Sequence, residues 1–258
     1  MILKTTELKV ADYMTPNPIS VGTDFPFQDA IGIMEDKGIG NLVVNEDHAV
    51  KGLFTEREIL QYITSYGEIP EILMKEVLLQ AFTGISLDAT LISAAKIMIL
   101  EKARLLVFVN KKLVGIITAS DILRGFRKTE SNPLLDKVMS TKIYQCTYDD
   151  SIINATKIMD EKRIGSIVIT KNNNPFGIFT ERDLLVNVLA NEVDLKSNVG
   201  GYCSTPLITT KIGMGGNEAA NLMAEKKIKR LVLTDKDKVV GIVTARDIVD
   251  AFQMAETL

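Results

Sequence analysis

Apolar and polar positions follow two different periodicities along the chain. Within residues 27–34 the apolar side chains recur at positions i, i+3, i+4 and i+7, which predicts an amphipathic helix. Two short apolar runs follow at 39–45 and 50–54, with a polar turn between them, and this pattern is typical of a β-hairpin. A further apolar run at 18–21 precedes the helix. The pattern predicts the order strand, helix, strand, strand.

The same pattern occurs four times. Each copy carries an Ala-x-x-x-Met pair in its predicted helix, beginning at Ala30, Ala94, Ala155 and Ala219. Each predicted hairpin ends in a Gly followed three residues later by Thr, and the glycines recur every 62 to 64 residues at Gly52, Gly115, Gly177 and Gly241. The other predicted strands are 84–87, 105–109, 113–117, 143–147, 166–170, 176–179, 206–210, 231–234 and 239–243. Repeats at this period indicate one supersecondary unit used four times.

A second helix is expected after each Thr. We therefore predict an α+β fold of four tandem strand-helix-strand-strand-helix repeats, with mixed sheets covered by helices. The Ala/Met stripe is expected to be core. The opening of the second copy, 79–83, lacks the Met-Thr-x-x-Pro pattern of the first, which weakens the prediction of its first strand.

Repeats one and three share Phe-Thr-Glu-Arg-acid, whereas repeats two and four share Gly-Ile-(Ile/Val)-Thr-Ala-x-Asp. The natural unit is then a pair of repeats that was duplicated once. The joint is expected in the polar segment 128–133, which ends at a helix-stopping proline. The predicted repeats are 8–66, 72–128, 134–192 and 196–254. The predicted modules are 1–130 and 131–258.

Composition narrows the function. The 258 residues are 46% apolar and 24% charged, enough for a sizeable core without disulfide or metal staples. The net charge of −3 disfavours a surface built throughout for nucleic acid. No run approaches the roughly 20 apolar residues that a membrane span needs, and the start lacks a basic leader with an apolar core. We expect a cytoplasmic protein.

Candidate catalytic side chains are scarce. Cys146 and Cys203 form no Cys-x-x-Cys pair and are expected to be reduced filler thiols. His48 is the single histidine and lies in a polar turn, which disfavours His-based acid–base chemistry, a triad or a metal site. The sequence therefore predicts no enzyme, no metal and no catalytic cofactor.

The segments 10–19, 138–141 and 203–208 resemble the start of a CBS domain, and the closing Gly-hydrophobic-x-Thr-x-x-Asp is similar to the ligand motif of that family. The resemblance spans about residues 8–253. It implies two Bateman modules, each a pseudo-symmetric pair of CBS repeats with clefts between them. Members of the family typically sense adenosine compounds such as AMP, ADP, ATP or S-adenosylmethionine and catalyse no reaction.

The motif has a physical basis for such a role. A Thr at a strand–helix junction presents its hydroxyl near free backbone N–H groups, and this positive helix end favours a phosphate. An acidic residue three positions later can accept two hydrogen bonds from a ribose diol. The alternative is that Thr-x-x-acid only caps the helix. The candidate binding residues are Thr55, Glu58, Thr118, Ser120, Asp121, Thr180, Arg182, Asp183, Lys229, Arg230, Thr244, Arg246 and Asp247.

The four copies differ. Repeat four keeps Thr244 and Asp247 and adds Arg246 as a phosphate ligand. Repeat one has Glu58 where the motif has Asp, and the extra methylene is expected to weaken a ribose contact. The predicted order of binding is repeat four, three, two, one.

Two other segments have alternative interpretations. The basic run 226–230 is either a solvated helix end, a phosphate-attracting edge of the repeat-four cleft, or a nucleic-acid patch. The Gly-rich segment 212–216 lacks the spacing of a P-loop or dinucleotide fingerprint and is expected to be a flexible connector.

The sequence predicts a regulatory adenine-nucleotide sensor that acts on a separate effector protein. The alternative is a nucleic-acid-associated regulator that uses 226–230. The chain is expected to form a homodimer, although two modules could also pack within one chain. No membrane contact is expected.

Overall fold

The computed structural model describes residues 4, 7–47, 49–102, 104–236 and 238–256, so His48 lies outside the described residues. The chain divides into two compact units. Unit 1 contains 1–18, 81–142 and 209–258, and unit 2 contains 19–80 and 143–208. Unit 1 thus holds repeats two and four, and unit 2 holds repeats one and three. Each unit takes one repeat from each predicted module, and the module pairing stays a prediction.

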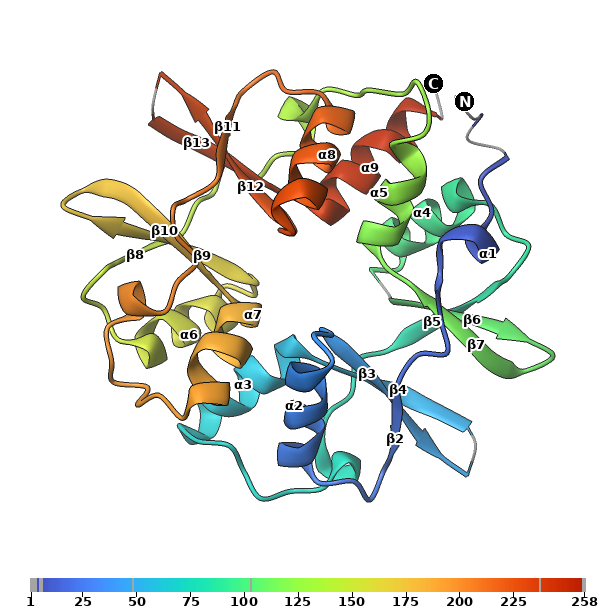
Figure 1. The fold of residues 1–258 in the computed structure, drawn as a ribbon, viewed down its shortest axis with the longest axis horizontal. Coiled ribbons are helices and arrows are strands. Elements are labelled where there is room, and N and C mark those ends of the chain that lie inside the picture. The colour runs from blue at the N-terminus through green and yellow to red at the C-terminus, as the bar shows by residue number, and fades with distance from the viewer. Residues whose placement is uncertain (1–3, 5–6, 48, 103, 237, 257–258) are drawn as a thin grey trace. The chain divides into compact units, whose positions relative to one another are not determined.

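Unit 2 has two three-stranded sheets, ordered β2-β3-β4 and β10-β9-β8 (Figure 1). Repeat one supplies β2 (Ser20–Gly22), α2 (Phe27–Asp36), β3 (Asn41–Glu46), β4 (Ala49–Thr55), α3 (Glu56–Tyr66) and the 3-10 turn η2 (Met74–Glu76). Repeat three supplies β8 (Gln145–Thr147), α6 (Ile152–Glu161), β9 (Ser166–Lys171), β10 (Asn174–Thr180), α7 (Glu181–Asp183) and the helical turns η4 (Leu184–Val188), η5 (Leu189–Asn191) and η6 (Val199–Gly201). In each sheet the short first strand is parallel to the first hairpin strand.

Unit 1 has the sheets β1-β7-β6-β5 and β11-β12-β13. Its first part contains α1 (Val10–Tyr13), β1 (Thr15–Pro16), β5 (Phe82–Ser86), α4 (Leu91–Leu100), β6 (Arg104–Val109), β7 (Lys112–Ile117), α5 (Ala119–Phe126) and η3 (Leu135–Lys137). Repeat four supplies β11 (Thr209–Lys211), α8 (Gly216–Lys226), β12 (Arg230–Asp235), β13 (Lys238–Thr244) and α9 (Ala245–Ala255). The predicted α+β fold of strand-helix-strand-strand-helix repeats is confirmed.

The doubt about the first strand of repeat two was wrong. Strand β5 has five residues, whereas β2, β8 and β11 have three each. It pairs in parallel with β6 from Phe82 to Ser86, and Ile85 is buried. The strand depends on this pairing and on burial of one face, not on the missing Met-Thr-x-x-Pro residues.

The motif glycines allow backbone to approach the hairpins. A Cβ on Gly52 would lie 2.7 Å from the Leu79 Cβ and 3.0 Å from the Gln80 carbonyl oxygen. The other three motif glycines are equally tight, Gly115 against Met14, Gly177 against Ser204 and Gly241 against Met139. At each motif glycine an incoming segment of the chain therefore approaches more closely than a Cβ would allow.

The connector segment 212–216 is more ordered than predicted. Gly216 begins α8, and its backbone N–H donates to the Pro133 carbonyl at 2.8 Å. A Cβ on Gly215 would overlap the Asn132 side chain. The two glycines therefore let the linker between repeats two and three lie against the start of α8.

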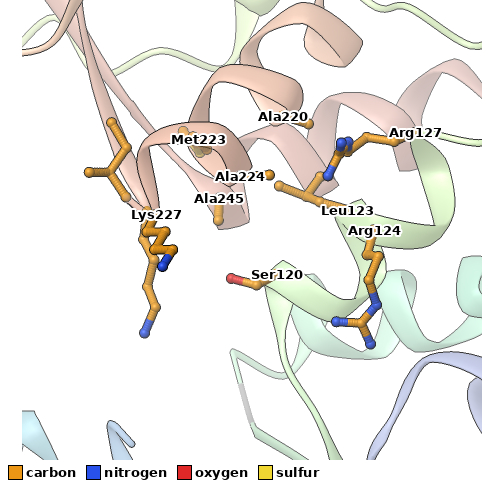
Figure 2. Close-up of a pocket in the computed structure, with 11 residues that line it drawn as sticks. Ser120, Leu123, Arg124, Arg127, Ala220, Met223, Ala224, Lys227 and Ala245 are labelled. Carbon is orange, nitrogen blue, oxygen red and sulfur yellow. The ribbon is translucent and has the colours of Figure 1, made fainter. Parts of the chain in front are cut away.

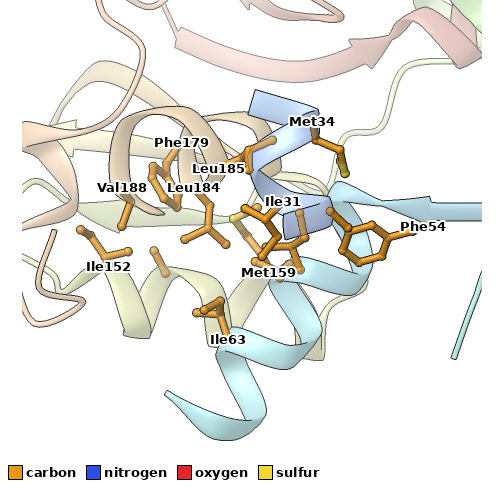
Figure 3. Close-up of a cluster of buried hydrophobic side chains, with 14 of the residues drawn as sticks. Ile31, Met34, Phe54, Ile63, Ile152, Met159, Phe179, Leu184, Leu185 and Val188 are labelled. Atoms are coloured by element: carbon orange, nitrogen blue, oxygen red, sulfur yellow. The ribbon is translucent and has the colours of Figure 1, made fainter. Parts of the chain in front are cut away.

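The core of unit 2 joins repeats one and three. Ile31, Met34 and Phe54 of repeat one are buried in one cluster with Met159 and Phe179 of repeat three (Figure 3). Unit 1 is similar, because the rings of Phe126 in repeat two and Phe252 in repeat four lie 4.9 Å apart between centroids. The Ala/Met stripe is buried in every repeat, as predicted. A single repeat therefore supplies only part of a core.

Among the described residues, no helix is both long and apolar enough to cross a bilayer.

Candidate ligand-binding site

Each motif Thr caps the helix that follows it. The Thr backbone N–H donates to one oxygen of the acid three residues later, at 2.9 Å for Glu58, 2.9 Å for Asp121, 2.9 Å for Asp183 and 2.7 Å for Asp247. The Thr hydroxyl donates to the same oxygen at 2.6 to 2.8 Å. The capping interpretation therefore holds in all four repeats. These bonds use one carboxylate oxygen of each acid, and the four repeats differ in what contacts the other oxygen.

In unit 2 that second oxygen is already hydrogen-bonded. Glu58 Oε1 accepts from the Gln80 amide at 2.5 Å. Asp183 Oδ1 accepts from the Ser204 hydroxyl at 2.7 Å and from the Asn187 amide at 3.0 Å. Glu58 is only 1% exposed, and burial raises its pKa although these hydrogen bonds oppose the rise. Neither acid presents an open oxygen to a ligand.

The two acids of unit 1 differ from each other. Asp121 Oδ1 forms an ion pair with Arg124 at 3.0 Å. Asp247 Oδ1 accepts no hydrogen bond from any residue that the structure describes. Burial is the main cause of a raised pKa at Asp247. Asp247 is therefore the motif acid best able to accept a hydrogen bond from a ligand.

The second residue after each Thr is Arg in three repeats and Ser in repeat two. Arg57 donates to the Ile164 carbonyl at 3.1 Å and Arg182 to the Ile39 carbonyl at 3.0 Å. Arg246 donates to the Met98 carbonyl in the last turn of α4. Each arginine thus reaches the end of the first helix in the partner repeat, where free carbonyls gather. Arg182, a predicted binding residue, and Arg246, predicted to contact phosphate, both donate to these carbonyls in the structure.

The first residue after each Thr is Glu in unit 2 and Ala in unit 1. Glu181 pairs with Arg57 at 3.2 Å, and Glu56 pairs with Arg182 at 3.4 Å. These two ion pairs cross between repeats one and three. In unit 1 the corresponding residues are Ala119 and Ala245, which cannot form such pairs.

A pocket of about 240 Å³ opens in unit 1 beside Ser120 and Ala245, whose side chains are shorter than those of the Arg and Glu at these positions in unit 2. Ser120 lies at the start of α5, with Ala245 and Lys227 of repeat four on the other side of the opening (Figure 2). Leu123 and Met223 add apolar lining. The pocket therefore combines the helix start of repeat two with the first helix and motif of repeat four.

Four basic side chains line this pocket, Arg124, Arg127, Lys227 and Lys229, and no acidic residue lines it. Arg127 donates to the Asn221 side-chain oxygen at 2.6 Å. Arg124 also donates to the Tyr13 carbonyl. Arg124 is paired with Asp121, so the positive local potential that favours an anion comes mainly from Arg127, Lys227 and Lys229.

The basic run 226–230 does not form a single surface stripe. Lys226 pairs with Glu225 at 2.8 Å, whereas Lys227 and Lys229 line the pocket. Arg230 begins β12 opposite Thr244 on β13. Lys227 and Lys229 thus lie where the phosphate-attracting interpretation of the run requires them.

Ser120 and Lys229 were predicted as binding residues and Lys227 belongs to the basic run 226–230, whereas Arg124 and Arg127 were not predicted. Arg124 and Arg127 follow Ser120 at helical spacing, which was an available signal. Lys227 is in the left-handed conformation at the end of α8, with φ 55°, and no sequence pattern marked its direction.

No group of three or more metal-binding side chains occurs within the described part of the chain. Cys146 and Cys203 are buried, and burial raises the pKa of both thiols to about 11.

Comparisons with known proteins agree with this architecture. The family model for the CBS domain matches residues 10–65, 74–128, 135–190 and 199–253. A Methanocaldococcus jannaschii protein, MJ1404, is 27% identical over 261 residues, covering 93% of this chain and 61% of MJ1404. The chain thus spans about three fifths of the length of that relative.

Two solved structures share the fold along almost the whole chain. The M. jannaschii protein MJ1225, proposed as an archaeal homologue of γ-AMPK, gives a TM-score of 0.79 at 17% identity and covers 95% of this chain and 100% of its own. A Pyrococcus horikoshii protein gives 0.67 at 19% identity, with the same coverage.

Proposed function

The chain belongs to the CBS-domain family, and from this premise we propose that it is a regulatory protein that binds an adenosine ligand in unit 1 and signals to a separate effector protein. The observation that carries the proposal is the basic pocket between repeats two and four. The proposed ligand is AMP, ADP or ATP. S-adenosylmethionine is less favoured, because its sulfonium cation would face four basic side chains.

The size of the pocket indicates which part of the ligand enters. Sites that bury a whole drug-sized molecule measure roughly 300–1,000 Å³, whereas this pocket measures about 240 Å³. We propose that it takes the phosphate end. The Ser120 hydroxyl at the start of α5, together with Lys227 and Lys229, would bind the phosphate oxygens.

The ribose is assigned to repeat four. Ala245 lines the pocket and Asp247 follows on the same helix. The second oxygen of Asp247 can accept a hydrogen bond from the ribose hydroxyls, while the first stays with Thr244. This assignment keeps the helix cap intact when the ligand binds.

Regulation would follow from a shift between conformations. A ligand that touches both repeats favours the arrangement in which its two sets of contacts are made at once. The effector reads that arrangement in trans, and no catalytic cofactor takes part. The fold shared with MJ1225, itself proposed as a homologue of γ-AMPK, agrees with a regulatory role. A cytoplasmic homodimer remains part of the proposal.

Calorimetry with AMP, ADP and ATP tests the site. Lys227→Ala and Lys229→Ala should each weaken binding about five- to thirty-fold, since a hydrogen bond to a charged group contributes about 1–2 kcal/mol. Lys226→Ala is the matched control, because Lys226 pairs with Glu225 outside the pocket. Equal losses in all three variants would show a diffuse charge effect and would reject the pocket.

Two further measurements separate the proposal from its alternatives. Ligands with a ribose cis-diol should raise the melting temperature more than their 2′,3′-dideoxy counterparts, and equal shifts would refute the ribose assignment. ATP should not be turned over by the purified protein. Tight nucleic-acid binding with a steep salt dependence would instead support a nucleic-acid regulator.

A further inference from the structure

We propose that Glu56 and Glu181 act as internal anions that close unit 2 to phosphate-bearing ligands, so that unit 1 alone takes such a ligand. The inference rests on the proposed function for its interpretation of unit 1. The closure of unit 2 is carried by contacts of its own.

The two glutamates form a reciprocal pair of contacts between repeats one and three. Arg57 contacts the Ile164 carbonyl and Glu181, and Arg182 contacts the Ile39 carbonyl and Glu56. The side chains of Glu56 and Glu181 are only 14% and 16% exposed. Both carboxylates therefore already occupy the guanidinium groups in a largely buried junction, as the oxygens of a bound phosphate would.

The same junction is open in unit 1. Helix α5 follows α3 at a spacing of 63 residues, and repeat four follows repeat three at a spacing of 64. Ser120 therefore corresponds to Arg57, and Ala245 corresponds to Glu181. The pocket lies where unit 2 has the Arg57–Glu181 ion pair.

The residues around the junction are also less basic in unit 2 than in unit 1. The positions that correspond to Arg124 and Arg127 are Gln61 and Thr64, which are uncharged. The positions that correspond to Ala224, Lys227 and Lys229 are Asp160, Arg163 and Gly165. The four cations around the unit 1 pocket are thus matched in unit 2 by one base and three uncharged residues, and Ala224 is matched by an acid, beside two ion pairs.

The motif acids complete the closure. Glu58 accepts a hydrogen bond from Gln80, and Asp183 accepts hydrogen bonds from Ser204 and Asn187. In the described part of unit 2, both motif acids therefore have their second oxygen hydrogen-bonded, and the two ion pairs occupy the junction that is open in unit 1. Its role in this proposal is to hold repeats one and three together, while unit 1 senses the ligand.

Removal of the internal anions should expose the site. In E56A/E181A, Arg57 and Arg182 keep their carbonyl contacts but lose their carboxylates. Titration calorimetry with inorganic pyrophosphate on the full chain should give one more equivalent bound than in the wild type. Arg57→Ala or Arg182→Ala added to this variant should remove the extra equivalent.

E68A/E71A is the matched control, because it removes the same charge from exposed positions of unit 2. It should leave the stoichiometry unchanged. The reverse exchange is S120R/A245E, which introduces the ion pair of unit 2 into the unit 1 pocket. It should abolish the equivalent that the wild type binds, with a circular dichroism spectrum like that of the wild type.

A folded E56A/E181A that binds no more pyrophosphate than the wild type overturns the inference. The inference is also overturned if R57A/R182A binds one equivalent of pyrophosphate less than the wild type, since unit 2 of the wild type would then already bind the anion. If E56A/E181A does not fold, S120R/A245E decides, and retained binding rejects the closure. Failure of the proposed function is distinguishable, because it would remove adenosine binding from the wild type but not the added site.

Discussion

At the scale of single residues, the four motif acids differ in the partner of their second carboxylate oxygen. Gln80, Arg124 and Ser204 contact that oxygen in repeats one, two and three, whereas Asp247 has no such contact from the described residues. Glu58, Asp121 and Asp183 are buried, whereas Asp247 is only half-buried. We interpret the second oxygen of Asp247 as an acceptor that stays available for a ligand, at less cost than a fully buried unpaired carboxylate would carry.

The first residue-scale prediction concerns Asp247→Asn. The variant keeps the size of the side chain and an oxygen for the Thr244 cap, but it loses the charge that strengthens hydrogen bonds from a diol. Binding of AMP should weaken about five- to thirty-fold, or 1–2 kcal/mol, with little change in melting temperature. Glu58→Gln should leave binding unchanged. Calorimetry on both variants that showed the opposite pattern would place the sensor in repeat one.

The second prediction uses the buried acid of repeat one. Burial raises the pKa of Glu58 in the folded state, so its contribution to stability is present below the pKa of the unfolded chain and decreases as pH rises through the folded pKa. Glu58→Gln should remove this decrease, giving a flatter free energy of unfolding as pH rises above the ordinary glutamate pKa of about 4.3. Urea unfolding at several pH values measures it, with exposed Glu68→Gln as control. An unaltered pH profile in E58Q would contradict the assignment.

The sequence identified every motif Thr and acid, since these recur at fixed spacing. It could not show what each acid contacts. Ser204 lies 21 residues from Asp183, and Gln80 lies 22 residues from Glu58. Such contacts depend on how the incoming segments cross the sheet, which local pattern does not encode.

At the scale of elements, the motif glycine decides whether an incoming segment can pair with a hairpin. A Cβ on Gly177 would lie 2.7 Å from both the Ser204 carbonyl oxygen and the Cys203 sulfur. Gly177→Ala should therefore cost about 1–3 kcal/mol through overpacking against backbone. Gly22→Ala is the matched control in strand β2, since nothing lies within 4 Å of its Cβ position, and it should change stability by less than about 0.5 kcal/mol. Similar melting temperatures for the two variants would rule out the close approach as the reason for the glycine.

One element differs from the regular helix that the pattern predicted. After Thr180 the chain forms a three-residue α-helix, then a π-helical turn at 184–188 and a 3-10 turn at 189–191. Asn187 lies in the π-helical turn and donates to Asp183 and to the Tyr202 carbonyl. The apolar periodicity of the segment is helical, so periodicity alone could not reveal the change in hydrogen bonding.

At the scale of the whole molecule, the sequence predicted four repeats and their internal order from period and pattern. Its shared motifs predicted consecutive pairs of repeats as modules, but the pattern does not determine which repeats share a core, because every repeat presents a similar apolar face. The distinction between Thr-Glu-Arg and Thr-Ala-x was visible in the sequence. The structural consequence of this difference is two ion pairs in unit 2 and an open pocket in unit 1. It became visible only when the structure showed which repeats pack together.

The shared cores lead to the last prediction. A cut between residues 130 and 131 separates Phe54 from Phe179 in unit 2 and Phe126 from Phe252 in unit 1. Each fragment alone would expose the faces that the other covers, at about 25 cal/mol per Å² of apolar surface. Fragments 1–130 and 131–258 should therefore self-associate and melt below the intact chain.

Mixing the two fragments should restore both cores in a 1:1 complex whose melting temperature approaches that of the intact protein. Light scattering after size-exclusion chromatography gives the masses, and circular dichroism gives the melting temperatures. A chain nicked after folding at a protease site inserted into 128–133 is the control, and it should stay assembled. If each fragment is instead a monomer as stable as the whole chain, the folding units are the consecutive pairs 1–130 and 131–258, since only a pair that closes its own core can unfold cooperatively without a partner.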